Sequence, residues 1–86
     1  MGERGTTVEV RVELKRGILD AEADSIEKSL RLLGLGGLAE VRTARVFSLT
    51  FEGVSEAEAR ERAHRAVDQL LANPVIHHVE MSVRPA

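Results

Sequence analysis

The chain has 86 residues, of which 43% are hydrophobic and 30% are charged, so we expect one domain with a single modest core. A net charge of −2 and an aromatic content of 2% argue against nucleic-acid binding, which relies on cationic surfaces and stacked rings. The absence of cysteine excludes disulfides, thiolate metal sites and thiol nucleophiles. No apolar run reaches the roughly 20 residues of a membrane span, and the N-terminus carries no signal-peptide core. We therefore expect a cytoplasmic protein without membrane contact.

The first predicted element is a strand that follows a leader over residues 1–6. Residues 8–14, VEVRVEL, alternate between apolar and charged side chains, and this period of two predicts a strand with one core face and one solvent face. The segment KRGILD then turns the chain at Gly17, because glycine accepts unusual backbone angles.

A helix is predicted to begin after Asp20, which is suited to the N-cap position and is followed by two acids in the first turn. Ile26, Leu30 and Leu33 follow at helical spacing and form one apolar stripe. Gly34 is predicted to close this helix.

Two strands are predicted in the middle of the chain. Val41–Thr43 forms a short one, and Phe47, Leu49 and Phe51 alternate with polar residues in the next. A hairpin over residues 43–45 would join them, although no strong turn dipeptide marks it.

The second helix begins with a capping box, in which the Ser55 oxygen accepts the backbone N–H of Glu58 and the Glu58 carboxylate reaches back. Its predicted apolar stripe consists of Ala59, Ala63, Ala66, Val67, Leu70 and Leu71. Pro74 disfavours helical geometry at Asn73 and is predicted to end the helix there.

The last strand is predicted to present one face made of Val75, His77, Val79, Met81 and Val83. His77 and His78 are adjacent on this strand, so they point to opposite faces and do not form a two-histidine metal site. His77 is expected at the edge of the core or in an interface, and His78 is expected to pair with Glu80.

The predicted order is therefore βαββαβ, an α+β fold of two layers. We expect an antiparallel four-stranded sheet with both helices on one face, in ferredoxin-like order. The other face would be polar apart from Val46 and Ile76, and its exposure together with two open edges favours self-association. No H-E-x-x-H or G-x-S-x-G motif is present, so we expect no catalytic, cofactor-binding or metal-binding residues, and a function in binding.

Three segments together resemble the PurS family, the small subunit of phosphoribosylformylglycinamidine (FGAM) synthase. They are LKRGILDAEADSIEKSLRLLG, the predicted strands over residues 41–51, and LLANPVIHHVEMSV. The resemblance spans nearly the whole length and implies a single PurS-like domain over residues 1–86. The signature positions are Lys15, Gly17, Ile18, Leu19, Asp20, Leu70, Leu71, Asn73 and Pro74. All of them can also be explained as turn, cap or core residues.

The resemblance implies a role within a purine-biosynthesis ligase complex. In that family a large synthetase subunit uses ATP and Mg, and a glutaminase subunit releases ammonia. The small subunit bridges the two, supports ammonia delivery and forms a dimer or tetramer. It holds no cofactor of its own.

Three features depart from the family pattern. Relatives often have Asp-Pro-Glu-Gly where this chain has residues 20–23 as Asp-Ala-Glu-Ala, and Gly-Lys where it has Ala44-Arg45. The GLGG turn at residues 34–37 lengthens the next loop. The residues also leave open an ACT-like regulatory module, which shares the element order and a glycine before the first helix and would bind an amino acid at a dimer interface.

Overall fold

The computed structural model describes residues 5–86 and contains a sheet, two helices and one π-helical turn. The elements are β1 (Thr6–Leu14), α1 (Ala21–Leu32), β2 (Arg45–Phe51), α2 (Glu56–Ala66), the π-helical turn η1 (Val67–Leu71) and β3 (His77–Pro85). The strands form an antiparallel sheet in the order β2–β1–β3. Of the predicted leader, residues 1–4 lie outside the described residues, whereas Thr6 already belongs to β1.

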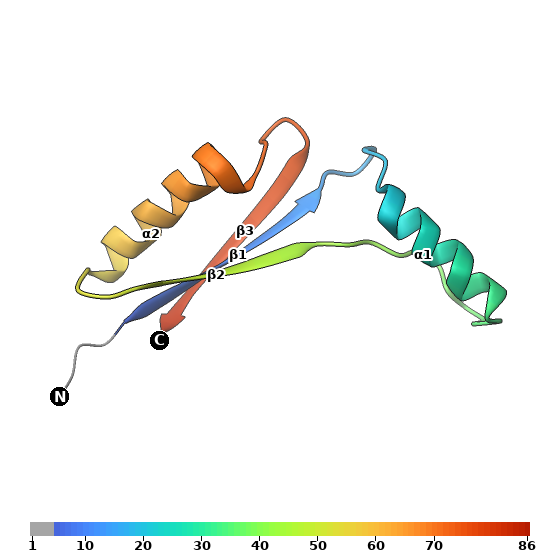
Figure 1. Ribbon diagram of the computed structural model, residues 1–86, viewed down its shortest axis with the longest axis horizontal. Helices are drawn as coiled ribbons and strands as arrows, with labels where there is room; N and C mark the ends of the chain where they lie inside the picture. The colour runs from blue at the N-terminus through green and yellow to red at the C-terminus, as the bar shows by residue number, and fades with distance from the viewer. Residues whose placement is uncertain (1–4) are drawn as a thin grey trace.

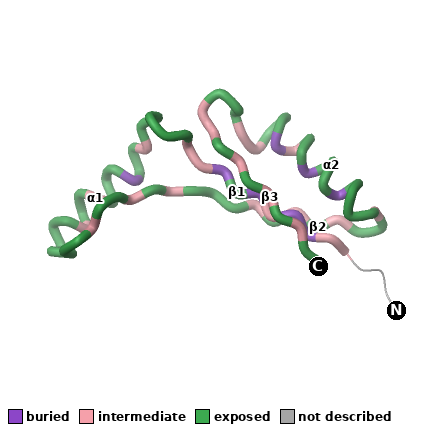
Figure 2. Tube along the Cα trace, turned by 180° about the vertical axis from the view of Figure 1, so that it is seen from behind, coloured by how far each residue is buried: buried purple, intermediate pink, exposed green. Residues whose placement is uncertain are grey.

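The core lies between α2 and one face of the sheet. Val8 and Val10 of the central strand are fully buried, and Ala59 and Ala63 of α2 are buried against the same cluster. The small alanines allow α2 to lie close to the strands, as their spacing in the sequence suggests. Figure 2 shows that most buried positions gather in this part of the molecule.

The opposite face of the sheet is polar and open, as predicted. Glu9 lies between Ser48 of β2 and Ser82 of β3 in the strand register. Arg84 of β3 forms an ion pair with Glu9 across the strands. Val46 is the apolar exception on this face and is 59% exposed.

The predicted fourth strand is absent, because Val41–Thr43 is assigned to no strand. Residues 38–44 instead form an extended connection from the turn after α1 into β2, so the hairpin predicted over residues 43–45 is not formed (Figure 1). The register places Arg45 opposite Val12, and no residue of β1 is paired with the segment before Arg45. A strand needs a ladder partner, and this chain supplies none there.

Helix α1 does not share the sheet face with α2, contrary to the predicted two-helix layer. It stands at the far end of the molecule from α2 (Figure 1), while the sheet packs mainly with α2. The molecule measures 53 × 31 × 15 Å, with a radius of gyration of 17.0 Å. A compact domain of this length would have a radius of about 12 Å.

Both predicted helix starts and the predicted end of α1 are confirmed. Asp20 is the N-cap of α1, and its side chain accepts the backbone N–H of Ala23. Gly34 follows the C-cap with a φ of 81°, a left-handed conformation that glycine adopts without a Cβ clash. Ser55 and Glu58 form the complete capping box of α2.

The predicted stripe of the second helix fails at Leu70, which is 83% exposed. The last turn is π-helical, with the Ala72 N–H bonded to the Val67 oxygen at 3.1 Å. This i→i+5 pattern inserts one residue into the turn and rotates Leu70 out of the stripe, while Leu71 packs against the core cluster. The helical conformation ends at Leu71, two residues earlier than predicted.

The last strand begins at His77 rather than at Val75, and Val75 is 75% exposed in the preceding turn. Asn73 accounts for the difference. Its side-chain oxygen accepts the Val75 N–H at 2.9 Å, and its carbonyl accepts the N–H groups of Ile76 and His77, so the turn extends over the residues that were predicted as strand. Within residues 5–86, no helix is long and apolar enough to cross a membrane.

Candidate functional site

The two signature segments of the sequence meet at one end of the sheet. The backbone N–H of Lys15, just after β1, donates to the carbonyl of Ile76, just before β3, at 2.8 Å. Residues 15–20 and 70–76 are far apart in the chain, but this bond joins the start of one segment to the end of the other. The tertiary structure thus builds one candidate region from two separate motifs.

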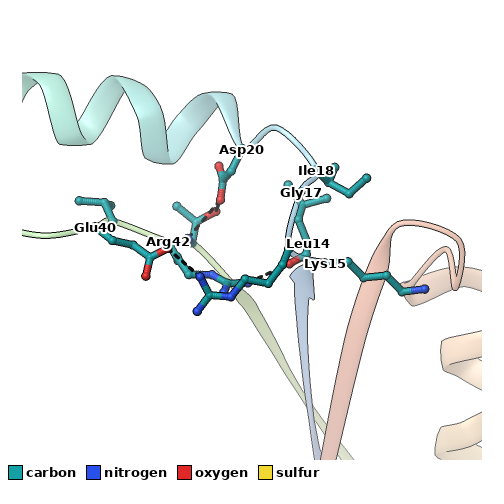
Figure 3. A pocket seen from close by; sticks show the side chains of 10 residues that line it. Leu14, Lys15, Gly17, Ile18, Asp20, Glu40 and Arg42 are labelled. Carbon is teal, nitrogen blue, oxygen red and sulfur yellow. Dashed lines mark hydrogen bonds and ion pairs between the residues drawn. The ribbon is translucent and has the colours of Figure 1, made fainter.

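A small pocket of about 160 Å³ lies where the connection to α1 leaves the sheet (Figure 3). We call it the base pocket. Its lining residues are Leu14, Lys15, Arg16, Gly17, Ile18, Asp20, Glu40, Val41, Arg42 and Thr43. Four of the nine signature residues are among them. The other lining residues are Leu14 at the end of β1, Arg16 in the connection to α1, and residues 40–43 before β2.

Asp20 is the central hydrogen-bond acceptor of the base pocket. One carboxylate oxygen accepts the Ala23 N–H at 2.9 Å. The other accepts the Thr43 hydroxyl at 2.7 Å and the Thr43 N–H at 3.2 Å. These bonds lower the pKa of the Asp20 carboxyl, first through the Ala23 N–H and then through the Thr43 hydroxyl, because they favour the charged form. One carboxylate therefore caps α1 and also ties it to the segment entering β2.

Arg42 makes a second connection across the base pocket. Its guanidinium donates to the carbonyl oxygen of Leu14 at 2.9 Å and pairs with Glu13 at 2.8 Å. Glu13 also pairs with Arg11, and this hydrogen bond is the main cause that lowers the pKa of the Glu13 carboxyl. The end of β1 is thereby linked to the segment before β2. We refer to the bonds made by Asp20 and Arg42 as the clamp.

A larger cleft of about 520 Å³ lies between α2 and β3. Its residues are Lys15, Arg60, His64, Val67, Asp68, Ala72, Pro74, His77, His78, Val79 and Met81. The lining combines apolar side chains with Lys15, Arg60 and three histidines, and Asp68 is its one acid. Lys15 lines this cleft as well as the base pocket, and in Figure 3 its side chain extends towards β3.

The two adjacent histidines have different surroundings, as their strand positions predicted. The Nδ1 atom of His77 accepts the Asn73 N–H at 2.8 Å, so the ring hydrogen of the neutral form resides on Nε2. His77 thus stabilises the turn before its own strand, a role that the sequence pattern did not indicate. His78 lies 3.4 Å from Glu80 on the exposed face, which confirms that predicted pair.

The remaining signature residues have different environments. Leu19 is 78% exposed beside the base pocket, and Leu70 is exposed next to the larger cleft. Leu71 packs against the core, Asn73 builds the turn before β3, and Pro74 lines the larger cleft. Of these five residues Pro74 alone lines one of the two cavities, and the five have no common role.

No group of three or more His, Asp or Glu side chains that could hold a metal ion occurs among residues 5–86.

The clamp partners Thr43 and Arg42 were not singled out in the sequence. Their contacts bridge 23 and 28 residues of chain, and no local period or spacing marks such a pair. One signal was available in the sequence: an N-cap aspartate uses one carboxylate oxygen for the helix, so the second oxygen of Asp20 could accept from a distant donor.

Comparison with known proteins matches residues 7–85 to the family described as "PurS: Phosphoribosylformylglycinamidine (FGAM) synthase". The chain belongs to the PurS family. The PurS subunit of Methanocaldococcus jannaschii is 36% identical over 74 residues, covering 86% of this chain and 89% of the relative. That of Archaeoglobus fulgidus is 41% identical over 68 residues, covering 79% and 85%.

Solved structures agree with this PurS assignment. The M. jannaschii PurS crystal structure superimposes with a TM-score of 0.81 at 33% identity, covering 92% of this chain and 95% of that one. A chain in the structure of PurLQS from Thermotoga maritima has a TM-score of 0.77 at 24% identity, covering 95% and 98%, and shows the shared fold. This PurS-family chain is thus a subunit of FGAM synthase, a ligase, and the ACT-like alternative is not supported.

Proposed function

We propose that the chain is a non-catalytic subunit that bridges the glutaminase and synthetase subunits of FGAM synthase and supports ammonia transfer between them. In this proposal the synthetase subunit binds ATP and Mg, and this chain binds no cofactor. The observation that carries the proposal is the joining of both PurS signature segments at one end of the sheet by the Lys15–Ile76 bond. Residues of the first segment line the base pocket, and residues of both segments line the larger cleft.

The surfaces of the protomer support a role in assembly. Leu33 at the C-cap of α1, Leu70 in η1 and Val75 before β3 are each at least 74% exposed, although removal of large apolar side chains from water is favourable. We propose that part of this surface forms a homo-oligomer, a dimer or tetramer, and that part contacts the two larger subunits. We place the assembly in the cytoplasm.

The test is reconstitution of the enzyme from the synthetase and glutaminase chains of the same genome, with and without this chain. We expect glutamine-dependent synthesis to require this chain, and ammonia-dependent synthesis by the synthetase chain to proceed without it. The reason is that a bridging subunit affects delivery of ammonia and not the chemical step. Full glutamine-dependent activity without this chain would contradict the proposal, as would an ammonia-dependent rate that needs it.

A further inference from the structure

The turn between η1 and β3 is organised by hydrogen bonds that Asn73 makes. Its carbonyl oxygen accepts the N–H groups of Ile76 and His77 at 3.0 and 2.8 Å, and its side-chain oxygen accepts the Val75 N–H at 2.9 Å. The N–H of Asn73 donates to Nδ1 of the His77 ring at 2.8 Å. This last bond differs from the other three because its acceptor belongs to a side chain type that ordinarily changes its charge between pH 5 and 8.

The bond between Asn73 and the His77 ring exists only while Nδ1 is unprotonated. Neutral imidazole accepts at one nitrogen and donates at the other, whereas imidazolium donates from both. A proton on Nδ1 would therefore set two N–H groups against each other. Among residues 5–86, the His77 ring is the one acceptor of the Asn73 N–H, so this N–H would turn to water instead.

The position of this bond gives it control over the entry to the turn. The donor belongs to the peptide group between Ala72, which is extended, and Asn73. It thus fixes the direction in which the chain leaves η1, and Pro74 has no N–H with which to replace it. At the other end of the turn, the carbonyl of Ile76 accepts the Lys15 N–H. The same turn therefore carries the contact between the two signature segments.

The charged groups on the α2 side of His77 do not favour a second positive charge. In the larger cleft, the ring shares the lining with one acid and four basic or titratable side chains, which are Asp68, Lys15, Arg60, His64 and His78. These surroundings become more cationic as the other two histidines gain protons. A protonated His77 ring is therefore repelled from this side.

The side of His77 that faces the clamp is more acidic. There His77 shares a cavity of about 400 Å³ with Glu13, Asp20, Glu22 and Arg45. Asp20 is already bonded within the clamp, and Glu13 is paired with two arginines. Glu22 forms none of the ion pairs found among residues 5–86. It is the acid toward which a protonated ring is drawn when it leaves Asn73.

We propose that His77 is a pH-sensitive latch on the turn between η1 and β3. The neutral ring accepts the Asn73 N–H and holds residues 73–76 in their folded conformation. The protonated ring releases this N–H, so the turn and the exposed Val75 within it become mobile. The latch is a property of this chain alone and does not require the bridging function.

The test follows the Asn73 amide and the His77 ring by NMR in the full chain, from about pH 7.5 to about pH 5.5. At the upper pH the ring should be the Nε2–H tautomer. The protection of the Asn73 amide, corrected for the pH dependence of exchange in unstructured peptides, should fall about tenfold as the ring gains its proton, the scale of one lost hydrogen bond. Constant protection during titration of the ring, a ring that stays neutral, or an Nδ1–H tautomer would each overturn the latch.

Substitutions separate the proton from the side chain. His77→Ala removes the acceptor, so the Asn73 amide should exchange rapidly at both pH values. His77→Gln offers an oxygen that does not titrate, so protection should change little with pH. His64→Gln and His78→Gln remove the other two rings that line the cleft and should keep the wild-type change. Circular dichroism checks the fold of each variant. A pH-dependent loss that persists without His77, or that either control abolishes, would overturn the latch.

The effect of the latch on the enzyme rests on the proposed function. Val75 in the turn and Leu70 in η1 are 75% and 83% exposed and belong to the surface proposed to contact other chains. In the reconstituted enzyme, the ratio of glutamine-dependent to ammonia-dependent rates should therefore fall in acid with the wild type and be retained with His77→Gln. Equal falls would overturn this effect. A chain that passes the NMR test but is not needed for glutamine use would overturn the bridging role and leave the latch intact.

Discussion

The body of the protein, formed by β1, β2, β3, α2 and η1, and its arm, residues 15–44 with α1, both contain a helix but differ in how that helix is stabilised. In the body, α2 packs two buried alanines onto the buried valines of β1. In the arm, a 12-residue helix with an equally regular apolar stripe packs on little more than the extended segment beside it. The comparison shows that an apolar stripe predicts the inner face of a helix, but not whether the helix packs onto its own sheet.

The difference has a local cause. Helix α2 is connected to β2 and β3 by turns that return it onto the sheet, whereas the clamp at Asp20 and Arg42 directs α1 away. The body is therefore expected to lose stability on core substitution in the isolated chain. The arm is expected to be sensitive mainly where its clamp is changed.

The largest effect is expected in the core of the body. Val10→Ala removes two methyl groups from a fully buried side chain and should lower the free energy of unfolding by about 2 kcal/mol or more. The matching substitution in the arm is Leu32→Ala, at a side chain that is 89% exposed and lies outside the apolar stripe of α1. This substitution should change the free energy of unfolding by less than about 0.5 kcal/mol. Urea denaturation of both variants measures the contrast, and equal losses would show that the arm is part of the same core.

A smaller effect is expected from the cap of α2. Ser55→Ala removes the acceptor of the Glu58 N–H and should cost about 1 kcal/mol of unfolding free energy. Ser55→Asp keeps an acceptor at the same position and serves as the matched control. If the alanine variant is as stable as the aspartate variant in urea, the capping box does not contribute to the stability of the body.

The clamp should be sensitive to pH through Asp20. Its lowered pKa means that its stabilising contribution is complete above the ordinary aspartate pKa of 3.8 and is lost as the pH falls through the lower pKa of the folded state. Asp20→Asn keeps a good N-cap but weakens the bonds to Thr43. We expect the Thr43 amide to exchange with solvent about tenfold faster in this variant at neutral pH, the scale of one lost hydrogen bond.

The same variant provides the pH control. The stability difference between the wild type and Asp20→Asn should be present at pH 7 and should disappear in acid, where the wild-type carboxyl is also protonated. Guanidinium denaturation at several pH values measures this difference. A difference that persists unchanged in acid would mean that the charge of Asp20 does not stabilise the clamp.

The smallest effect is expected on the open face of the sheet. His78 and Glu80 both have side chains that are more than half exposed, and exposed pairs contribute little. His78→Ala should therefore change the free energy of unfolding by less than about 0.5 kcal/mol. A larger loss, measured without the other subunits, would indicate that copies of the chain cover this face in an oligomer. The loss should then become smaller at low protein concentration, where oligomers dissociate.

Much of the local structure could be predicted because its causes are local. The alternation in VEVRVEL placed β1, and the caps at Asp20, Gly34 and Ser55 marked helix ends that the structure confirms. The predictions failed where a distant or unusual hydrogen bond decides the outcome. The π-helical turn that exposes Leu70 and the Asn73 turn that delays β3 are not encoded by hydrophobic spacing.

The class of fold, the two faces of β1 and the PurS resemblance that the comparisons confirm could be predicted from the amino-acid sequence, since they depend on side-chain periods and short motifs. Only the tertiary structure decided that the sheet has three strands, that the two signature segments meet at Lys15 and Ile76, and that α1 stands apart from the body. Strand pairing and helix docking are contacts between distant residues, and the clamp joins residues that are 23 and 28 positions apart in the chain.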